Sequence, residues 1–552
     1  MATVSPHHFV ATSGETAPVW AHTEPYSNRP KFPQLSQNTS ADVCIIGSGI
    51  SGVQSAYELI KRGRSVVMLE ARDAISGETD RTSGHLASAL DDHYLEIEKK
   101  HGEEGAKLAA DSHKWASKHV GEVARELGID CEYRQLPAYL ISQYDRQTQS
   151  SEHDAEVKRL IMGEVEQANR FGLSAEFKTG FAVKGWDGKP DQRDASIFHE
   201  QATFHPTKYL TGVLKWLKEQ PSFTCYTHSR VMDVQEKGIE VMGIGKKTVT
   251  VSTDTGHTVE CSDAIMATCV PLQKLSIVAE LEYMRTYCIA VKVPQGYVED
   301  YLLYDTAEAY KYVRLTRCDE QNDYLVVGGC DHKVGQEETL GRFQELEDWI
   351  RERFTKAGSV DYAWSGQVFE PVDYMGFIGL NPGTKHTYII TGDSGNGLTH
   401  GVIAGRLITD QIEGVKNYWG KLYSPSRKAS LLKSAGTAMA HDVQIQAQYK
   451  RFLQSDIKDI EDLAPGSGGV LNSTTKVPVA VYKDDEGGVH KFSALCPHMK
   501  GVICWNGVEK SWDCPVHGSR FSKDGVCVMG PAKGHLNPAD ESGEKLQSEA
   551  VK

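Results

Sequence analysis

The chain has 552 residues, with 60 basic and 74 acidic side chains and a formal net charge of −14. This length predicts about two to four units with full-sized cores, and the acidic balance argues against a nucleic-acid or anionic-membrane surface. No run of about eighteen apolar residues occurs, and residues 1–20 lack the basic flank and apolar core of a signal peptide, so we expect a cytoplasmic protein without a membrane span.

The cysteines divide into two groups. Eight of the twelve are scattered between Cys44 and Cys330 without the spacing of a disulfide framework, which is typical of reduced thiols in an intracellular protein. The other four lie close together near the C-terminus.

The first strong pattern covers residues 42–72. An apolar run at 43–46 predicts a strand buried on both faces, a glycine-rich turn follows it, and a helix is expected over about 51–62. A second strand at 65–69 ends at Glu70, where an acidic side chain can accept a hydrogen bond from a ribose hydroxyl. This order of elements predicts the first βαβ unit of a dinucleotide-binding domain. A glycine-rich turn without a ligand is the alternative.

Three glycines of that turn have separate expected tasks. Gly47 allows the tight exit from the strand, Gly49 lets the backbone approach a pyrophosphate, and Gly52 lets the helix pack closely on the sheet. The N-terminus of the helix then faces the phosphates with its unpaired N–H groups.

Two later segments are expected to complete the same sheet. A buried strand over 263–271 carries Thr268 near its end, and a strand over 387–391 runs into a glycine-rich turn and a helix that continues to residue 412. The material between the parts of this sheet is therefore predicted to form an inserted second domain. The loop at 77–85 is rich in small and hydroxyl residues and has donors for a second ring system or for more phosphate; an ordinary surface turn is the alternative.

The inserted region supplies the candidates for catalysis. Strand alternation puts Tyr310, Tyr312 and Arg314 on one face, which either lines a substrate cavity or is the wet side of an antiparallel sheet. His332 sits beside Asp331, which could orient one ring nitrogen and leave the other to accept a substrate proton. The competing interpretation is that the Asp-His pair caps a turn.

The most specific motif lies near the C-terminus. Cys496-x-His498 is followed by fifteen residues and then by Cys514-x-x-His517. Two Cys and two His suit tetrahedral Zn, although a single residue between Cys and His is unusual for a zinc finger. The set also suits a [2Fe–2S] cluster in which two thiolates bind one iron and two imidazoles bind the other.

At these residues the chain resembles the Rieske domain family, and its first 430 residues resemble the D-amino-acid-oxidase-like group of FAD-dependent oxidoreductases. The resemblance covers about residues 20–538 and rests on the stretches GETDRTSGHLASALDD, FHPTKYL, GGCDHKVGQ, WSGQVFEPVDYMGFIG, TGDSGNGLTHG and EKSWDCPVHGSRF. It implies an α/β fold, in which a Rossmann-like FAD-binding domain carries an inserted antiparallel-sheet substrate domain and is followed by an all-β Rieske domain.

The resemblance also implies boundaries and ligands. The expected division is an N-terminal arm at 1–40, an oxidoreductase domain at 41–430 with FAD-binding segments at about 41–90, 200–275 and 360–415, a helical connector at 431–456 and a Rieske domain at 457–545. The residues expected at FAD are Gly47, Gly49, Ile50, Ser51, Gly52, Glu70, Ala71, Arg72, Thr79, Thr82, Ser83, Thr268, Gly395, Asn396, Gly397, Leu398 and Thr399. Those expected at the [2Fe–2S] cluster are Cys496, His498, Cys514 and His517.

The Rieske motif departs from the respiratory proteins at two places. Gly501 and Val516 stand where those proteins carry an extra disulfide-forming cysteine pair, so Cys504 and Cys527 are expected to be free thiols. Phe521 stands where they place a tyrosine whose hydroxyl lies near a cluster thiolate. Because hydrogen bonds to cluster sulfurs help to set the potential, we expect a potential below that of the respiratory proteins.

The function implied by the resemblance is oxidation of a small organic substrate, an amine or amino-acid derivative, by hydride transfer to FAD. The Rieske domain would relay the electrons to or from an external electron-transfer partner or reductase. Two alternatives stay open: a flavin/Rieske monooxygenase or reductase fed by an external reductase, and a non-enzymatic redox sensor or electron carrier, which predicts a closed flavin site without a substrate cavity. A Rieske non-haem oxygenase needs a further iron domain, and only 35 residues follow His517.

Overall fold

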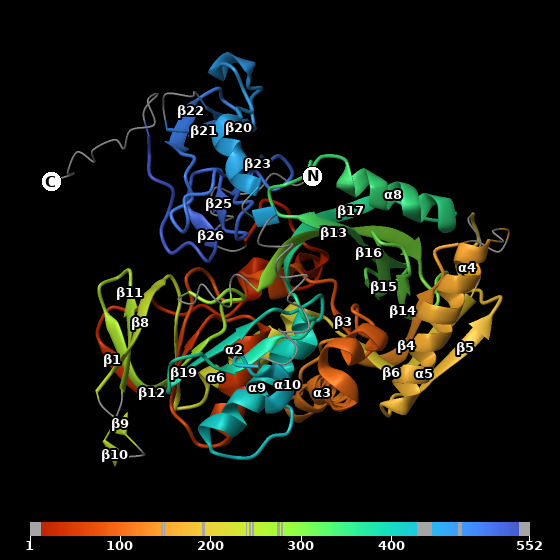
Figure 1. Ribbon diagram of the computed structural model, residues 1–552, viewed down its shortest axis with the longest axis horizontal. Coiled ribbons are helices and arrows are strands. Elements are labelled where there is room, and N and C mark those ends of the chain that lie inside the picture. Colours follow the sequence, from red (N-terminus) through yellow and green to blue (C-terminus); the bar gives the residue numbers. More distant parts are fainter. Residues whose placement is uncertain are drawn as a thin grey trace.

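The computed structural model describes residues 13–144, 147, 150–189, 194–238, 240–241, 244–245, 248–272, 277, 280–427, 444–445, 447–472 and 477–539. These residues form two large sheets with helices around them and two small sheets near the C-terminus (Figure 1). None of the helices among them is long and apolar enough to cross a membrane.

The first large sheet has eight strands and contains the predicted βαβ unit. β1 (Thr39–Ile46) lies parallel to both β2 (Val66–Leu69) and β12 (Thr258–Met266), and β12 lies parallel to β19 (Thr387–Thr391). The prediction that distant segments complete one sheet is therefore confirmed. Its other strands are β7 (Phe223–Tyr226), β8 (Val231–Lys237), β11 (Thr248–Thr253) and β18 (Phe377–Leu380).

Alternation along β1 explains why its apolar run is continuous. Val43 and Ile45 face a core shared with the helices, whereas Cys44 and Ile46 face a second core that β8 and β11 help to form. The helices are α2 (Ile50–Lys61), α3 (Tyr94–Glu126), α6 (Pro206–Lys218), α9 (Gly397–Ile412) and α10 (Gly420–Tyr423).

Glycines set how closely the elements around the nucleotide turn approach one another. A Cβ on Gly52 would lie 1.9 Å from the carbonyl oxygen of Gly47, and Gly47 has a φ of +109°. On α9, a Cβ on Gly405 would lie 2.8 Å from the backbone carbon of Gln54 in α2. The turn and the α2–α9 contact therefore both require the absence of a side chain.

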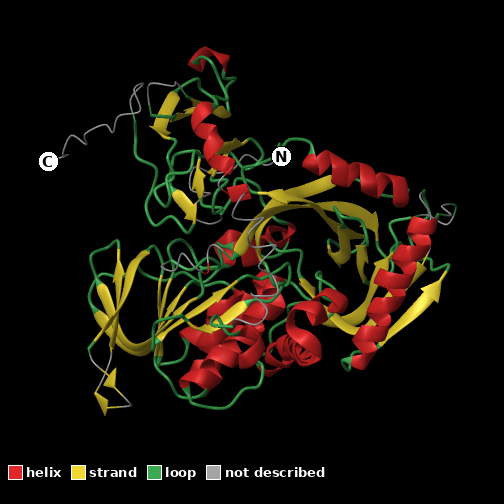
Figure 2. Ribbon diagram, viewed as in Figure 1, coloured by secondary structure: helices red, strands yellow, loops and turns green. Residues whose placement is uncertain are grey.

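The second large sheet has nine strands and is mostly antiparallel, as Figure 2 shows, which confirms the inserted antiparallel domain. Its strands are β3 (His85–Leu86), β4 (Arg134–Ile141), β5 (Ala175–Thr179), β6 (Asp194–Thr203), β13 (Leu281–Pro294), β14 (Leu302–Asp305), β15 (Lys311–Arg317), β16 (Asn322–Lys333) and β17 (Val360–Pro371). The associated helices are α4 (Ser151–Glu156), α5 (Gly163–Arg170), the π-helix η4 (Val157–Met162) and α8 (Arg342–Arg353). One face of this sheet packs its apolar side chains against α8.

The C-terminal region folds into two small antiparallel sheets. β20 (Ser467–Leu471), β21 (Val479–Lys483) and β22 (Val489–Ser493) form one, and β23 (Cys504–Asn506), β24 (Ser511–Asp513), β25 (Arg520–Ser522) and β26 (Cys527–Met529) form the other. This confirms the predicted all-β C-terminal domain. Much of the expected connector at 431–456 lies outside the described residues; its described end contains the short 3₁₀ helix η5 (Gln448–Leu453).

The remaining elements are short. They are η1 (Val19–His22), η2 (Tyr26–Asn28), η3 (Glu78–Arg81), η6 (Ile460–Asp462), β9 (Glu240–Val241) and β10 (Ile244–Gly245). The C-terminal domain, blue in Figure 1, contacts both large sheets. Arg72 and Arg230 beside the first sheet donate to the carbonyls of Val528 and Cys527, and Gln367 of β17 donates to the carbonyl of Gly518.

Candidate functional site

A cavity opens at the carboxyl ends of β1 and β2. Of the residues predicted at FAD, it is lined by Gly47, Gly49, Glu70, Ala71, Arg72, Thr79 and Thr268. Glu70 is held in place because its Oε2 accepts from the N–H of Ser48 at 3.0 Å and its Oε1 accepts from the N–H of Arg72 at 3.1 Å. This is the position at which the βαβ pattern puts a ribose partner.

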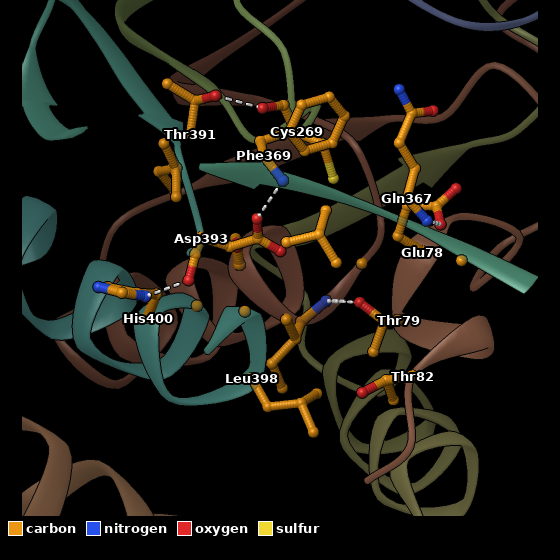
Figure 3. Close-up of a pocket in the computed structure, with 18 of the residues that line it drawn as sticks. Glu78, Thr79, Thr82, Cys269, Gln367, Phe369, Thr391, Asp393, Leu398 and His400 are labelled. Atoms are coloured by element: carbon orange, nitrogen blue, oxygen red, sulfur yellow. Dashed lines mark hydrogen bonds between the residues drawn. The ribbon is translucent and has the colours of Figure 1, made fainter. Parts of the chain in front are cut away.

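A second cavity, shown in Figure 3, shares lining residues with the first. Both are lined by Gly49, Thr79 and Cys269. The predicted residues Ile50, Ser51, Thr82, Gly395, Gly397 and Leu398 also line this second cavity. The Thr79 hydroxyl accepts from the N–H of Ile50 at 3.1 Å, which ties the 77–85 loop to the helix N-terminus.

The walls of the second cavity carry buried polar groups. Asp393 Oδ1 accepts from the N–H of Phe369 at 2.9 Å, and burial raises the pKa of Asp393 to about 7. Burial also lowers the pKa of His400 to about 4, so its ring is neutral at pH 7, and its Nδ1 lies 3.0 Å from the carbonyl oxygen of Asp393. Hydrogen-bonding groups without a net positive charge in a largely enclosed slot suit a polar ring system such as a flavin.

A third cavity adjoins the second at Thr286, Val368 and Gly395. The predicted substrate residues Tyr310 and Tyr312 line it, as do Ser83, Asn396 and Thr399 from the FAD prediction. The Tyr310 hydroxyl donates to Asp91 at 3.1 Å. This cavity therefore lies directly beside the second one, so the second cavity is not closed on this side.

Arg314 does not line this cavity. It lies on the same face of β15 as Tyr310 and Tyr312, but its Nη1 donates to the carbonyls of Gly84 at 2.7 Å and Phe204 at 2.9 Å. Its guanidinium also packs 5.2 Å from the ring centre of Trp20. These contacts fix the N-terminal arm and the 77–85 loop, so the geometry does not support a substrate-binding role for Arg314.

His332, the predicted base, is not among the described residues that line the cavity. Its Nδ1 donates to the carbonyl of Lys333 and its Nε2 accepts from the hydroxyl of Tyr287, both at 3.0 Å. Burial lowers the pKa of His332. Because side chains alternate along β16, Asp331 faces the cavity and His332 faces the α8 side of the sheet.

Several residues of the cavity were not among the sequence candidates. They are His85, Asp91, Tyr304, Asp331 and Glu370. Asp91 belongs to the stretch GHLASALDD and Asp331 to GGCDHKVGQ, both of which carry the family resemblance. The family stretches therefore pointed to these two aspartates. Strand alternation allows only one member of the Asp331-His332 pair to face the cavity, and the sequence alone does not show which one.

The four residues expected at the iron–sulfur cluster come together from two similar loops. In the first loop the N–H of Lys500 donates to the carbonyl of Cys496, and in the second the N–H of Gly518 donates to that of Cys514. The rings of His498 and His517 lie 5.0 Å apart, and the buried Nδ1 of His498 has no hydrogen-bond partner among the described residues.

The two thiols are hydrogen-bonded to each other. This bond, together with others from the N–H groups of His498 and Met499, lowers the pKa of Cys496 to about 7, and the same bond raises the pKa of Cys514 well above its ordinary value. Two adjacent thiols and two adjacent imidazoles are the ligand types of a binuclear cluster with two ligands for each iron.

The expected departures from the respiratory pattern are seen in the loops. A Cβ on Gly501 would lie 2.4 Å from Val516 Cγ2, so these residues adjoin without a disulfide. None of the twelve cysteines, all of which lie in the described part of the chain, forms a disulfide. Cys504 donates to the carbonyl of Gly335, Cys527 donates to that of Ala532, and Phe521 is fully buried.

The cluster loop touches the wall of the flavin slot. The ring of His517 lies 6.2 Å from that of Tyr283, and Tyr283 lies 5.7 Å from Phe369, which lines the slot. Gln367, another lining residue, donates through Nε2 to the carbonyl of Gly518 at 2.9 Å. The dinucleotide cavity, the adjoining substrate cavity and the Cys-His loops together define a flavin-dependent oxidoreductase with an iron–sulfur domain.

The comparison with known families agrees. Residues 42–411 match the FAD dependent oxidoreductase family and residues 455–540 match the Rieske [2Fe-2S] domain. The chain belongs to the FAD dependent oxidoreductase family and carries a C-terminal Rieske domain; its cofactors are FAD and a [2Fe–2S] cluster. In this setting FAD exchanges a hydride with a substrate and the cluster exchanges single electrons.

Three relatives illustrate the match. The Bacillus subtilis protein YhfW, named as a Rieske 2Fe-2S iron-sulfur protein, is 26% identical over 97% of this chain and 99% of its own length. The gamma-glutamylputrescine oxidoreductase of Escherichia coli is 23% identical over 69% of this chain and 86% of its own. The structure of glycine oxidase from Geobacillus kaustophilus covers 71% of this chain and all of its own, with a TM-score of 0.57 and 15% identity, which shows a shared fold.

Proposed function

We propose that this protein oxidises a small organic amine or amino-acid derivative at FAD and passes the electrons one at a time to its Rieske cluster. The single observation that carries the relay is the contact between the cluster loop and the flavin slot. His517, Tyr283 and Phe369 form an unbroken series of packed rings from the cluster to the slot. An external partner would then exchange electrons with the cluster.

The substrate class is supported by the relatives and by the cavity. The names of the similar proteins specify gamma-glutamylputrescine and glycine as their compounds, both of which carry a nitrogen next to a C–H bond. FAD, when bound, accepts the hydride of such a bond. The nitrogen must first lose its extra proton, because a protonated amine does not release a hydride from its neighbouring carbon.

A carboxylate of the third cavity is the best proton acceptor in place of His332. Burial raises the pKa of Asp331 to about 6 and that of Asp91 to about 7. A base with a pKa near the working pH accepts a proton most efficiently. Asp331 also has one buried oxygen, Oδ1, without a hydrogen-bond partner among the described residues.

The test is anaerobic mixing of the purified holoenzyme with a panel of amines and amino acids. We expect one class of compound to bleach the flavin absorbance, and a rhombic EPR signal of the reduced cluster to follow the bleaching. In the Cys514→Ala variant, which removes a cluster ligand, the same compounds should bleach the flavin without producing the EPR signal.

Two results would contradict the proposal. If no compound of the panel bleached the flavin while an added reductase reduced the cluster first, electrons would run inward from a reductase. If the flavin were bleached but the cluster of the unaltered protein stayed oxidised, the relay between the two would be wrong.

A further inference from the structure

We propose that the cavity beside the flavin slot binds an elongated dicationic amine, and that Asp91, Asp331 and Glu370 recognise its positive charges. The inference deepens the proposed function and rests on it for the identity of the reacting site. Among the described residues, the lining of this cavity contains these three carboxylates and neither lysine nor arginine. An α-amino acid would bring its own carboxylate among them without a basic partner.

The first independent observation is the orphan oxygen of Asp331. Its Oδ1 is inaccessible to solvent and has no hydrogen-bond partner among the described residues, although the residue lines the cavity. A buried carboxylate oxygen without a partner is costly, so a ligand that donates a charged N–H to it would remove that cost. An ammonium group has this chemistry.

The second observation is the aromatic wall. Tyr304, Tyr310 and Tyr312 line the same cavity. Aromatic faces attract organic cations, and the attraction is greater where water is excluded. Carboxylates and tyrosine rings around one small space are therefore suited to a cation with an apolar chain.

The third observation concerns the place of Asp91. A Cβ on Gly395 would lie 1.9 Å from Asp91 Oδ2, so only glycine at this position lets the carboxylate reach the edge of the flavin slot. Gly395 itself lines both the slot and the third cavity. Asp91 therefore lies where the slot and the third cavity meet, and a substrate nitrogen bound at this junction would be close to its carboxylate.

The space continues outward from the flavin. A fourth cavity is lined by Asp91, Tyr304, Tyr310 and Glu370, all of which also line the third. Among the described residues, its further acidic lining residues are Asp92, Glu96, Glu164, Asp305 and Glu308, against one arginine, Arg159, and one histidine, His93. If one ammonium group of a diamine binds in the third cavity, its second ammonium group, several carbons further along the chain, would lie among the acidic side chains of the fourth cavity.

Mutual repulsion of the carboxylates supports a cationic occupant. Burial, together with the neighbouring carboxylates of Asp331, Glu282, Asp91 and Asp393, raises the pKa of Glu370 to about 8. A bound dication would offset this repulsion and favour the ionised carboxylate. A ligand with a carboxylate at its second end would add to it.

The experiment compares three probes of similar length on oxidised holoenzyme by isothermal titration calorimetry. They are 1,4-diaminobutane, butylamine and 5-aminopentanoate, which carry two, one and no net positive charges. We expect the diamine to bind at least about tenfold more tightly than butylamine, which corresponds to about 1.4 kcal/mol, and 5-aminopentanoate to bind more weakly than butylamine.

Charge-removing variants test the residues. Asp331→Asn and Glu370→Gln should each reduce the preference for the diamine, and the double variant should abolish it. Asp348→Asn changes a carboxylate on α8 that accepts a hydrogen bond from Gln344 at the surface, and it should leave the preference unchanged. Flavin absorbance in each variant verifies that the FAD site is intact.

The outcomes separate this inference from the proposed function. Equal binding of diamine and butylamine, or tighter binding of 5-aminopentanoate, would overturn the inference even if the flavin were reduced by another amine. Selective binding of the diamine that depends on Asp331 and Glu370, without flavin reduction by any amine, would support the inference and overturn the proposed oxidation.

Discussion

His332 and Asp331 are neighbours in β16, yet they belong to different parts of the molecule. Asp331 lines the substrate cavity, whereas both ring nitrogens of His332 are used in the core under α8. The pair shows how strand alternation separates two adjacent polar residues. A base next to the flavin is therefore expected among the carboxylates and not at the histidine.

The His332→Ala variant should lose stability but keep its chemistry. The change removes the partner of the Tyr287 hydroxyl, which is fully buried, and we expect a cost of about 1–3 kcal/mol in the free energy of unfolding. The rate of anaerobic flavin reduction should change by less than about threefold, whereas loss of a general base costs about 100-fold or more. Thermal unfolding and stopped-flow absorbance measure the two quantities. A 100-fold slower reduction in a stably folded His332→Ala protein would restore the histidine as the base.

Glu509, in the turn between β23 and β24 of the C-terminal domain, contacts two arginines of the oxidoreductase domain. Glu509 contacts Arg81 at 2.7 Å and Arg285 at 3.1 Å, and all three side chains are fully buried. Burial alone would raise the pKa of Glu509, but Arg81, Arg285 and Arg520 hold it well below its ordinary value of 4.5. Burial and Arg520 lower the pKa of Arg285, so the carboxylate is what keeps this guanidinium stable in its charged form.

Replacement of this carboxylate should destabilise the interface in a pH-dependent way. Glu509→Gln leaves two buried guanidinium groups without their counter-charge, and we expect a loss of about 3–5 kcal/mol at pH 7. Because the folded-state pKa of Glu509 is depressed, its contribution is present above pH 4.5 and is lost as the pH falls below that value. The difference in melting temperature between variant and unaltered protein should therefore narrow below pH 4.5. Glu486→Gln, at an exposed position of the same domain, should show little difference at any pH, and a Glu509→Gln effect that stayed constant through acid pH would contradict the assigned charge.

At the scale of the whole molecule, the two cofactor domains meet where electrons would pass. The contact consists of the ring series from His517 to Phe369 and of the hydrogen bond from Gln367 to Gly518. The close approach depends on Gly518, which has a φ of +68°. A Cβ at this position would lie 2.6 Å from Tyr283 and 2.7 Å from Gln367 Nε2.

The Gly518→Ala variant should therefore slow electron transfer between flavin and cluster while both cofactors stay bound. The side chain forces Tyr283 or Gln367 away, and the left-handed backbone adds a strain of about 1–2 kcal/mol. Rapid-freeze EPR after anaerobic flavin reduction measures the transfer rate. Gly487→Ala is the matched control, because Gly487 lies in the same domain with a φ of +90° and a Cβ there meets no atom within 4 Å. An unchanged transfer rate in Gly518→Ala, with the cluster signal present, would show that electrons do not cross at this contact.

The βαβ unit and the cluster loops could be predicted from the sequence because each depends on a short stretch of the chain. The βαβ unit depends on an apolar run, three glycines and one acidic residue within 42–72, and the cluster loops depend on four residues with fixed spacing. Such patterns are readable because backbone geometry and metal chemistry act on neighbouring residues. The division into a Rossmann-like domain, an inserted antiparallel sheet and an all-β C-terminal domain followed from these patterns and from the family resemblance.

Which polar side chains line the same cavity could be seen only in the folded structure. Asp91, Asp331 and Glu370 are far apart in the chain and meet only because the register of the second sheet and the turn at Gly395 bring them to one cavity. Glu509 meets Arg81 across 428 positions of sequence. Arg314 and His332 have the residue types of a site but face the arm and the α8 core. A local pattern fixes a side chain's strand and its alternation, but the choice of the buried face depends on long-range packing, which no short stretch of sequence contains.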